Sequence, residues 1–136
     1  MIVRVKLYSD GGARGNPGLA AGAYLILNEE DEVILSGSIF LGKRTNNQAE
    51  YEALIAGLKA ASSLNVGEVQ CFLDSELVCR QLTGQYKVKN QDLSLLWKKV
   101  KDLARSFSKV SFFNVPRTDL FIQRADRLVN EKLDLI

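Results

Sequence analysis

The order of strand and helix patterns along the chain constrains its fold more than any other feature of the sequence. Residues 2–9 alternate apolar and polar side chains, and residues 20–28 and 33–41 form two further strand patterns. The glycine-rich segment 10–18 and the acidic segment 29–32 are the predicted turns between them. Three consecutive strands joined by turns predict an antiparallel meander.

After the meander, predicted helices alternate with predicted strands. A helix of about 15 residues begins at Thr45, and a later, shorter helix ends before Gly84. The elements after the first helix are a strand over 69–73, helices over 75–82 and 91–106, a strand over 110–115 and a helix over 123–134. The complete order is βββαβααβα, which predicts an α/β domain with a five-stranded mixed sheet and helices packed on both faces.

Length and composition limit the possible functions. The 136 residues suffice for one domain, and we interpret residues 1–136 as a single domain. A net charge of +2 is too near neutral to indicate nucleic-acid binding, so such a function has to rest on local sites. The chain has no histidine, which excludes a His-based catalytic triad and a His-ligated metal.

The sequence shows no sign of a membrane or secretory segment. No apolar run is long enough to span a bilayer, and the first residues lack the apolar stretch of a signal peptide. Cys71 and Cys79 are too few for a disulfide framework, and we interpret them as reduced thiols. These features predict a cytoplasmic protein.

Four acidic residues fall where they can share one site. Asp10 follows the first predicted strand and Asp74 follows the fourth, and a crossover through the intervening helix places these two strand ends side by side. Glu50 lies in that helix, and Asp126 lies in the first turn of the last predicted helix. Four carboxylates in one pocket repel one another unless a cation neutralises them. Their hard oxygen ligands suit Mg²⁺ or Mn²⁺.

Each of these acidic residues also has a purely structural interpretation. Asp10 before two glycines fits a turn aspartate, and Asp74 fits a helix N-cap. Glu50 fits an exposed helix residue, and Asp126 fits a favourable interaction with the helix dipole. The residues taken singly therefore do not identify a site, and their neighbours have to decide.

Four segments resemble the motifs of type 1 ribonuclease H, in the order in which that family has them. They are YSDGGARGNPG at 8–18, TNNQAEYEAL at 45–54, LDSELV at 73–78 and RADRLVN at 124–130. The resemblance spans essentially the whole chain and implies the RNase H-like fold. It implies an endonuclease that cleaves the RNA strand of RNA/DNA hybrids with two divalent metal ions, Mg²⁺ or its substitute Mn²⁺, and leaves 5′-phosphate and 3′-hydroxyl ends. The family's catalytic, metal-binding carboxylates match Asp10, Glu50, Asp74 and Asp126.

The resemblance also implies contacts with the minor groove of the hybrid. Asn16, Asn46 and Gln48 match the positions that make these contacts, and Asn47 is expected to share this role or to reach the DNA strand. Amide side chains both donate and accept hydrogen bonds, which suits the 2′-hydroxyl that distinguishes RNA from DNA. The alternative for Asn46 and Asn47 is capping of the helix.

Further residues match phosphate-binding positions of the family. Lys43, Thr45 and Asn90 match a pocket for a DNA-strand phosphate, and Arg117 is expected to attract phosphate through its permanent charge. Lys43 also fits an ordinary solvated surface charge. Lys101 and its neighbouring lysines have two interpretations, a contact with backbone phosphates or a solvated helix face.

The sequence departs from the family pattern in two places. Many members carry a histidine in the loop before the last aspartate, whereas residues 116–126 contain none and Ile122 stands where asparagine is common. Some members insert a basic helix and loop, whereas only residues 84–90 connect the two middle helices here. Neither departure affects the four carboxylates, so they bear on rate and affinity rather than on the type of reaction.

The sequence therefore predicts a monomeric, magnesium-dependent ribonuclease whose partner is an RNA/DNA hybrid, with no membrane and no obligate protein partner. Two alternatives remain, a related metal-dependent nuclease and a hybrid-binding module without activity. The segment 45–54 argues against the first because it matches a hybrid-reading motif. The four carboxylates argue against the second, since clustered negative charge weakens phosphate binding.

Overall fold

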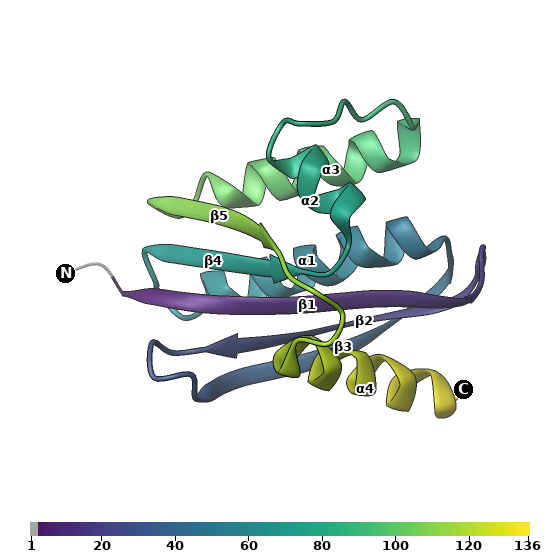
Figure 1. Ribbon diagram of the computed structural model, residues 1–136, viewed down its shortest axis with the longest axis horizontal. Helices are drawn as coiled ribbons and strands as arrows, with labels where there is room; N and C mark the ends of the chain where they lie inside the picture. Colours follow the sequence, from purple (N-terminus) through teal and green to yellow (C-terminus); the bar gives the residue numbers. More distant parts are fainter. Residues whose placement is uncertain (1–2) are drawn as a thin grey trace.

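The computed structural model describes residues 3–136, which form a five-stranded sheet and four helices (Figure 1). The strands are β1 (Arg4–Gly15), β2 (Gly18–Leu27), β3 (Val33–Arg44), β4 (Glu68–Leu73) and β5 (Lys109–Asn114). The helices are α1 (Asn46–Ser62), α2 (Glu76–Leu82), α3 (Gln91–Ala104) and α4 (Leu120–Asp134). The predicted element order and the α/β class are confirmed.

The strand order is β3-β2-β1-β4-β5, so the first strand lies at the centre of the sheet. β1, β2 and β3 form the predicted antiparallel meander, whereas β4 and β5 run parallel to β1. Tyr8 of β1 is paired with Phe72 of β4. Asp10 and Asp74 each follow this pair by two residues, so they lie at neighbouring positions, Asp10 within β1 and Asp74 just after the end of β4.

Helices cover both faces of the sheet. On one face, α1 buries Leu7 of β1 against Leu54 and Leu58, and α3 packs on α1. On the other face, α4 packs over β1, β2 and β3, and the small side chains of Ala21 and Ala23 let it approach closely. None of the helices within residues 3–136 is long and apolar enough to cross a membrane.

Glycines on the two central strands allow α1 to lie directly on the sheet. A Cβ atom at Gly11 would collide with the main-chain carbonyl of Ala49, and one at Gly22 would come within 2.8 Å of the Ala53 Cβ. Real Cβ atoms do not approach other atoms this closely, so any side chain at Gly11 would push α1 away. This close approach brings the N-terminal turns of α1 to the middle of β1.

The prediction that residues 10–18 form a turn is wrong. β1 continues through Asp10 to Gly15, and the turn consists of residues 16–17. Gly11 serves close packing rather than bending, because it pairs with Gly22 and both lie under α1. Gly15, with a φ of +94°, leads into the turn. The predicted start of this strand at Ile2 lies outside the described residues.

The prediction that Asp126 lies in the first turn of the last helix is also wrong. Asp119 caps that helix, its Oδ1 accepting hydrogen bonds from the backbone N–H groups of Phe121 and Ile122 at 2.9 and 3.2 Å. The helix therefore begins three residues earlier than predicted, and Asp126 lies in its second turn. The other element ends differ from the predictions by three residues or fewer.

Candidate active site

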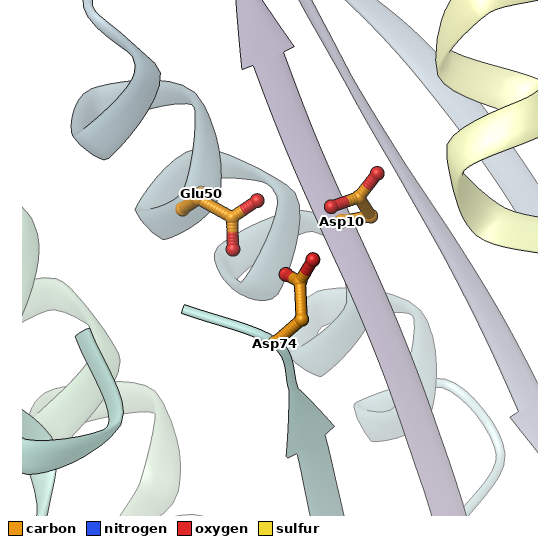
Figure 2. A group of neighbouring side chains, drawn as sticks. All are labelled: Asp10, Glu50 and Asp74. Carbon is orange, nitrogen blue, oxygen red and sulfur yellow. The ribbon is translucent and has the colours of Figure 1, made fainter. Parts of the chain in front are cut away.

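Three carboxylates from three separate elements converge beside the central strand (Figure 2). Asp10 comes from the middle of β1, Asp74 directly follows β4, and Glu50 projects from the second turn of α1. One carboxylate oxygen from each residue lies within 4.8 Å of those of the other two. Asp10 is only 7% exposed, and the other two are half-buried.

Backbone contacts fix the position of Glu50. The Gly11 N–H donates a hydrogen bond to Glu50 Oε1 at 2.8 Å, at the point where the missing side chain lets α1 touch β1. A capping box holds the start of α1, with Thr45 Oγ1 accepting from the Gln48 N–H and Gln48 Oε1 accepting from the Thr45 N–H. The glutamate is therefore held on a rigid element rather than on a loop.

The carboxylates perturb one another electrostatically. Burial is the main cause that raises the pKa of Asp10 to about 7, and repulsion from Asp74 and Asp126 adds to it, whereas a hydrogen bond with Glu50 acts in the opposite direction. Burial and the charges of Asp10 and Asp74 also raise the pKa of Glu50 well above its ordinary value. Ionisation of Asp10 and Glu50 is therefore unfavourable in this cluster, and a divalent cation would stabilise the ionised carboxylates.

The structural interpretations of Asp10 and Asp74 do not hold. Asp10 is a buried strand residue rather than a turn residue. The N-cap of α2 is Ser75, whose hydroxyl accepts from the Val78 N–H, so Asp74 is free of that role. Neither aspartate has a local structural function that would explain its position in the cluster.

Asp126 lines the same cavity without joining the tight cluster. The cavity has a volume of about 550 Å³, and all four predicted carboxylates contribute to its wall. Among residues 3–136, the oxygens that lie within 4.8 Å of one another belong to Asp10, Glu50 and Asp74, and Asp126 faces them from α4. The structure thus brings Asp10, Glu50 and Asp74 together and places Asp126 on the wall of the same cavity, close enough to Asp10 to raise its pKa.

Arg117 reaches the cluster from the loop before α4. Its Nε lies 3.6 Å from Asp74 Oδ2, and it lines the carboxylate cavity. The Arg117 side chain is 92% exposed, so this ion pair contributes little to stability and breaks easily. The loop therefore presents an exposed positive charge at the cavity.

Amide side chains connect the β1–β2 turn to the start of α1. Asn16 Oδ1 accepts from the Asn46 N–H at 3.0 Å, and Asn46 Oδ1 accepts from the Ala13 N–H at 2.9 Å. The helix N-cap is Thr45, so the prediction that Asn46 or Asn47 caps the helix is wrong. The two asparagine acceptors instead satisfy backbone donors and hold the turn against the helix.

A second cavity gathers most of the predicted substrate-binding residues. It has a volume of about 230 Å³ and is lined by Asn16, Thr45, Asn47, Gln48, Asn90, Asp92 and Leu93. Asn90 also caps α3, its Oδ1 accepting from the Leu93 N–H. Asn47 lines both cavities and Asn46 lines the carboxylate cavity, so the amide side chains form a continuous surface between them. Lys43 is exposed near the end of β3 and does not line the second cavity.

The structure also gives roles or positions to residues outside the predicted catalytic and substrate-binding residues. Lys101 donates to the Leu82 carbonyl at 2.6 Å and lies over the ring of Trp97, so it is a structural residue rather than a free phosphate contact. Ser75 and Gln123 line the carboxylate cavity, although the sequence analysis did not select them. Gln123 precedes Asp126 by three residues on α4, so the two side chains lie on the same side of the helix. This spacing could have identified Gln123 as a residue of the cavity.

With this fold and this acidic cavity, the chain matches a family of known proteins. The family model described as reverse transcriptase-like matches residues 8–132. The chain also superposes on the crystal structure of RNase H1 from the halophilic archaeon Halobacterium salinarum with a TM-score of 0.94 and 39% identity, covering 98% of this chain and 99% of that one. The chain belongs to the type 1 ribonuclease H family, as its motifs predict.

Individual relatives differ in how much of their length this chain covers. Ribonuclease HI of Halobacterium salinarum is 40% identical over 96% of this chain, and a bifunctional protein of Mycobacterium tuberculosis is 39% identical over 97%. The chain spans 65% and 36% of the lengths of these two proteins. A structure of LC11-RNase H1 in complex with an RNA/DNA hybrid has a TM-score of 0.90 and 37% identity, covering 97% of this chain and 99% of that one.

Proposed function

We propose that this protein is an endonuclease that cleaves the RNA strand of RNA/DNA hybrids and leaves 5′-phosphate and 3′-hydroxyl ends. The observation that carries this proposal is the convergence of the buried Asp10 with the half-buried Glu50 and Asp74 in a chain with the type 1 ribonuclease H fold. The hybrid-bound structure of a relative that is 37% identical supports the choice of substrate.

The carboxylates fit a pair of divalent metal ions. The donor set consists of oxygen atoms alone, it is compact, and burial and mutual repulsion raise the pKa of Asp10 and Glu50, which a cation would counteract. Asp10, Glu50, Asp74 and Asp126 would hold Mg²⁺, with Mn²⁺ as a substitute. Such a metal pair supplies activation of a water molecule and stabilisation of the leaving oxygen in phosphodiester hydrolysis. The roles of the chain's own residues are to position the metals, to orient the hybrid and to select the strand.

The amide surface is suited to selecting RNA. Asn16, Asn46, Asn47 and Gln48 offer donors and acceptors beside the carboxylate cavity, where they can bind 2′-hydroxyl groups in the minor groove of the hybrid. Because Asn16 and Asn46 are anchored to backbone groups, their side chains are preorganised for this contact. A duplex that lacks 2′-hydroxyls would leave these polar groups without partners.

Phosphate contacts orient the two strands. Thr45 and Asn90 line the second cavity, which we assign to a DNA-strand phosphate. Lys43, two residues before Thr45 in the chain, offers an exposed positive charge to the same strand. Arg117 can exchange its weak pairing with Asp74 for a phosphate of the RNA strand. An arginine stays protonated, and the chain contains no histidine, so neither residue type carries the reaction's protons.

We further propose that residues 1–136 act as a single domain and as a monomer in the cytoplasm, with the hybrid as partner and without a membrane or an obligate protein partner. The free, buried thiols of Cys71 and Cys79 are consistent with a reducing compartment. Sedimentation of the purified chain tests the oligomeric state, and a monomer is the expected result.

The decisive test compares four end-labelled substrates with and without Mg²⁺: hybrid, single-stranded RNA, duplex RNA and duplex DNA. The proposal expects internal cuts in the RNA strand of the hybrid, with 5′-phosphate on the downstream fragments. These cuts should occur only when Mg²⁺ is present. Binding of the hybrid without any cut would support the non-catalytic alternative. Cleavage of duplex DNA at a similar rate would support a general metal-dependent nuclease.

A further inference from the structure

Three aromatic side chains stack across three neighbouring strands on the sheet face that carries α4. Tyr8, Phe72 and Phe113 occupy paired positions on β1, β4 and β5. The ring centroids of Tyr8 and Phe72 are 4.7 Å apart at 14°, and those of Phe72 and Phe113 are 5.3 Å apart at 23°. Phe121 of α4 closes the inner end of this aromatic row against Tyr8 at 5.1 Å.

The aromatic row becomes more exposed toward the edge of the sheet. Tyr8 is 8% exposed, Phe72 is half-buried, and Phe113 is 41% exposed. β5 is an edge strand, and α4 packs over β1, β2 and β3 on this face (Figure 1). One face of the Phe113 ring is therefore covered by Phe72, and the opposite face borders solvent beyond the last strand.

On β1, β4 and β5, the part of this face that lies away from the carboxylates is polar, which distinguishes the aromatic row from a general apolar patch. The two neighbouring rows on β1, β4 and β5 are Lys6–Gln70–Ser111 and Arg4–Glu68–Lys109. A protein partner would require a wider apolar surface than a single ring provides. A flat aromatic ring that continues an existing stack instead matches the shape of one nucleobase.

The aromatic row lies next to the carboxylate cluster. Phe72 precedes Asp74 by two residues and Tyr8 precedes Asp10 by two residues, a distance of about 7 Å along each strand. Two stacked nucleotides cover about the same distance. A nucleic-acid strand held at the carboxylates can therefore place its next bases at the row.

Three cations on the elements around the row can compensate the phosphates of such a strand. Arg117 lines the carboxylate cavity, and the Arg124 guanidinium lies 5.6 Å from the Phe121 ring centroid. Lys109 begins β5, four residues before Phe113 and on the same side of the strand. The surroundings of the aromatic row thus favour a phosphate-linked ligand over an apolar peptide.

We propose that Phe113, supported by Phe72, is a stacking platform for an unpaired base of the RNA strand beside the cleavage site. This inference rests on the proposed function for the identity of the strand, because the carboxylates act on RNA. Stacking on an aromatic ring does not depend on base identity, so the platform favours hybrids with a single-stranded RNA extension without selecting a sequence.

The test measures binding of two hybrids in the Asp10→Asn background with Mg²⁺ present, so that the RNA stays intact. One hybrid is blunt, and the other carries a short RNA extension, placed at the 5′ or the 3′ end, with 2-aminopurine as a fluorescent base. The extension at one of these ends should tighten binding about tenfold and quench the 2-aminopurine fluorescence. Phe113→Ala and Phe113→Leu should both abolish the gain and leave binding of the blunt hybrid unchanged. Phe40→Ala, at a 42% exposed phenylalanine on the opposite edge strand, should retain the gain.

Several results would overturn the platform. They are a gain that persists in Phe113→Ala, an equal gain from a DNA-strand extension, an equal loss for blunt and extended hybrids, or self-association of the wild type that Phe113→Ala removes. The proposed function fails separately, through the absence of hybrid cleavage by the wild-type protein. The fluorescence of the extension still reports stacking in that case, so the two failures are distinguishable.

Discussion

Replacing Asp10 by asparagine should stabilise the metal-free protein while abolishing its activity. In the folded state, burial and the neighbouring carboxylates raise the pKa of Asp10 from its ordinary value of 3.8 to about 7. The folded state therefore binds more protons than the unfolded state between these values, and stability falls as the pH rises from about 4 to about 7. Above pH 7 the ionised carboxylate costs about 4 kcal/mol of folding free energy, an order-of-magnitude figure. Asparagine has nearly the same shape without the charge.

The measurement is thermal unfolding at pH 8 in EDTA, followed by titration with Mg²⁺. For a domain of this size the melting temperature should rise by roughly 10 °C in Asp10→Asn, and its dependence on pH between 4 and 7 should flatten. Mg²⁺ should raise the melting temperature of the wild type and have little effect on the variant, because one ligand is lost. Glu131→Gln, at an exposed position on α4, serves as a control that should match the wild type throughout.

Three results would refute this reasoning. An unchanged or lower melting temperature of Asp10→Asn in EDTA would show that the carboxylate is not destabilising. An undiminished response to Mg²⁺ in the variant would show that Asp10 is not a metal ligand. Cleavage of the hybrid at near-normal rates would show that the cluster is not the catalytic centre.

Three further predictions concern substrate recognition. Asn46→Ala should lower kcat/KM on the hybrid roughly ten- to hundredfold. Asn46→Asp retains the acceptor for the Ala13 N–H, so it should restore thermal stability without restoring kcat/KM. Full rescue of kcat/KM by aspartate would assign Asn46 a structural role alone. Arg117→Ala should lower kcat/KM while leaving the pH profile unchanged, because its charge attracts phosphate without carrying protons; a shifted profile would contradict this. The logarithm of the affinity for the hybrid should fall less steeply with the logarithm of the salt concentration than in a relative with the basic insertion, because Lys101 is engaged with Leu82. Binding titrations between about 50 and 200 mM salt measure this slope, and equal slopes would indicate an unrecognised row of basic residues that binds the hybrid.

The periodicity of the sequence sufficed to predict the elements and their order. Apolar alternation and helical spacing report local conformation, and the pairing of β1 with β4 followed from the helix between them. The resemblance of the motifs to one family then gave the fold and the family, which the structure and the relatives confirm. The carboxylates were selected from their positions at strand ends and in helices and then by the match of their motifs, and the structure brings Asp10, Glu50 and Asp74 together.

The errors arose where tertiary packing overrides local signals. The two glycines after Asp10 predict a turn, but β1 continues because α1 needs the space above Gly11. The helix start at Leu120 depends on the side chain of Asp119, whose capping contacts the periodicity does not report. The aromatic row was missed for a related reason, since Tyr8, Phe72 and Phe113 are far apart in the chain and become neighbours through strand register alone.

The central position of β1 also determines when the active site can form. β1 pairs with β2 immediately after it in the sequence, but its other neighbour, β4, begins only at Glu68. Asp126 arrives later still, on the last helix, 116 residues after Asp10. Such long-range parallel contacts form slowly, because a large loop has to close before they stabilise the chain. During synthesis on the ribosome, the carboxylate cavity is therefore incomplete until α4 has emerged and docked.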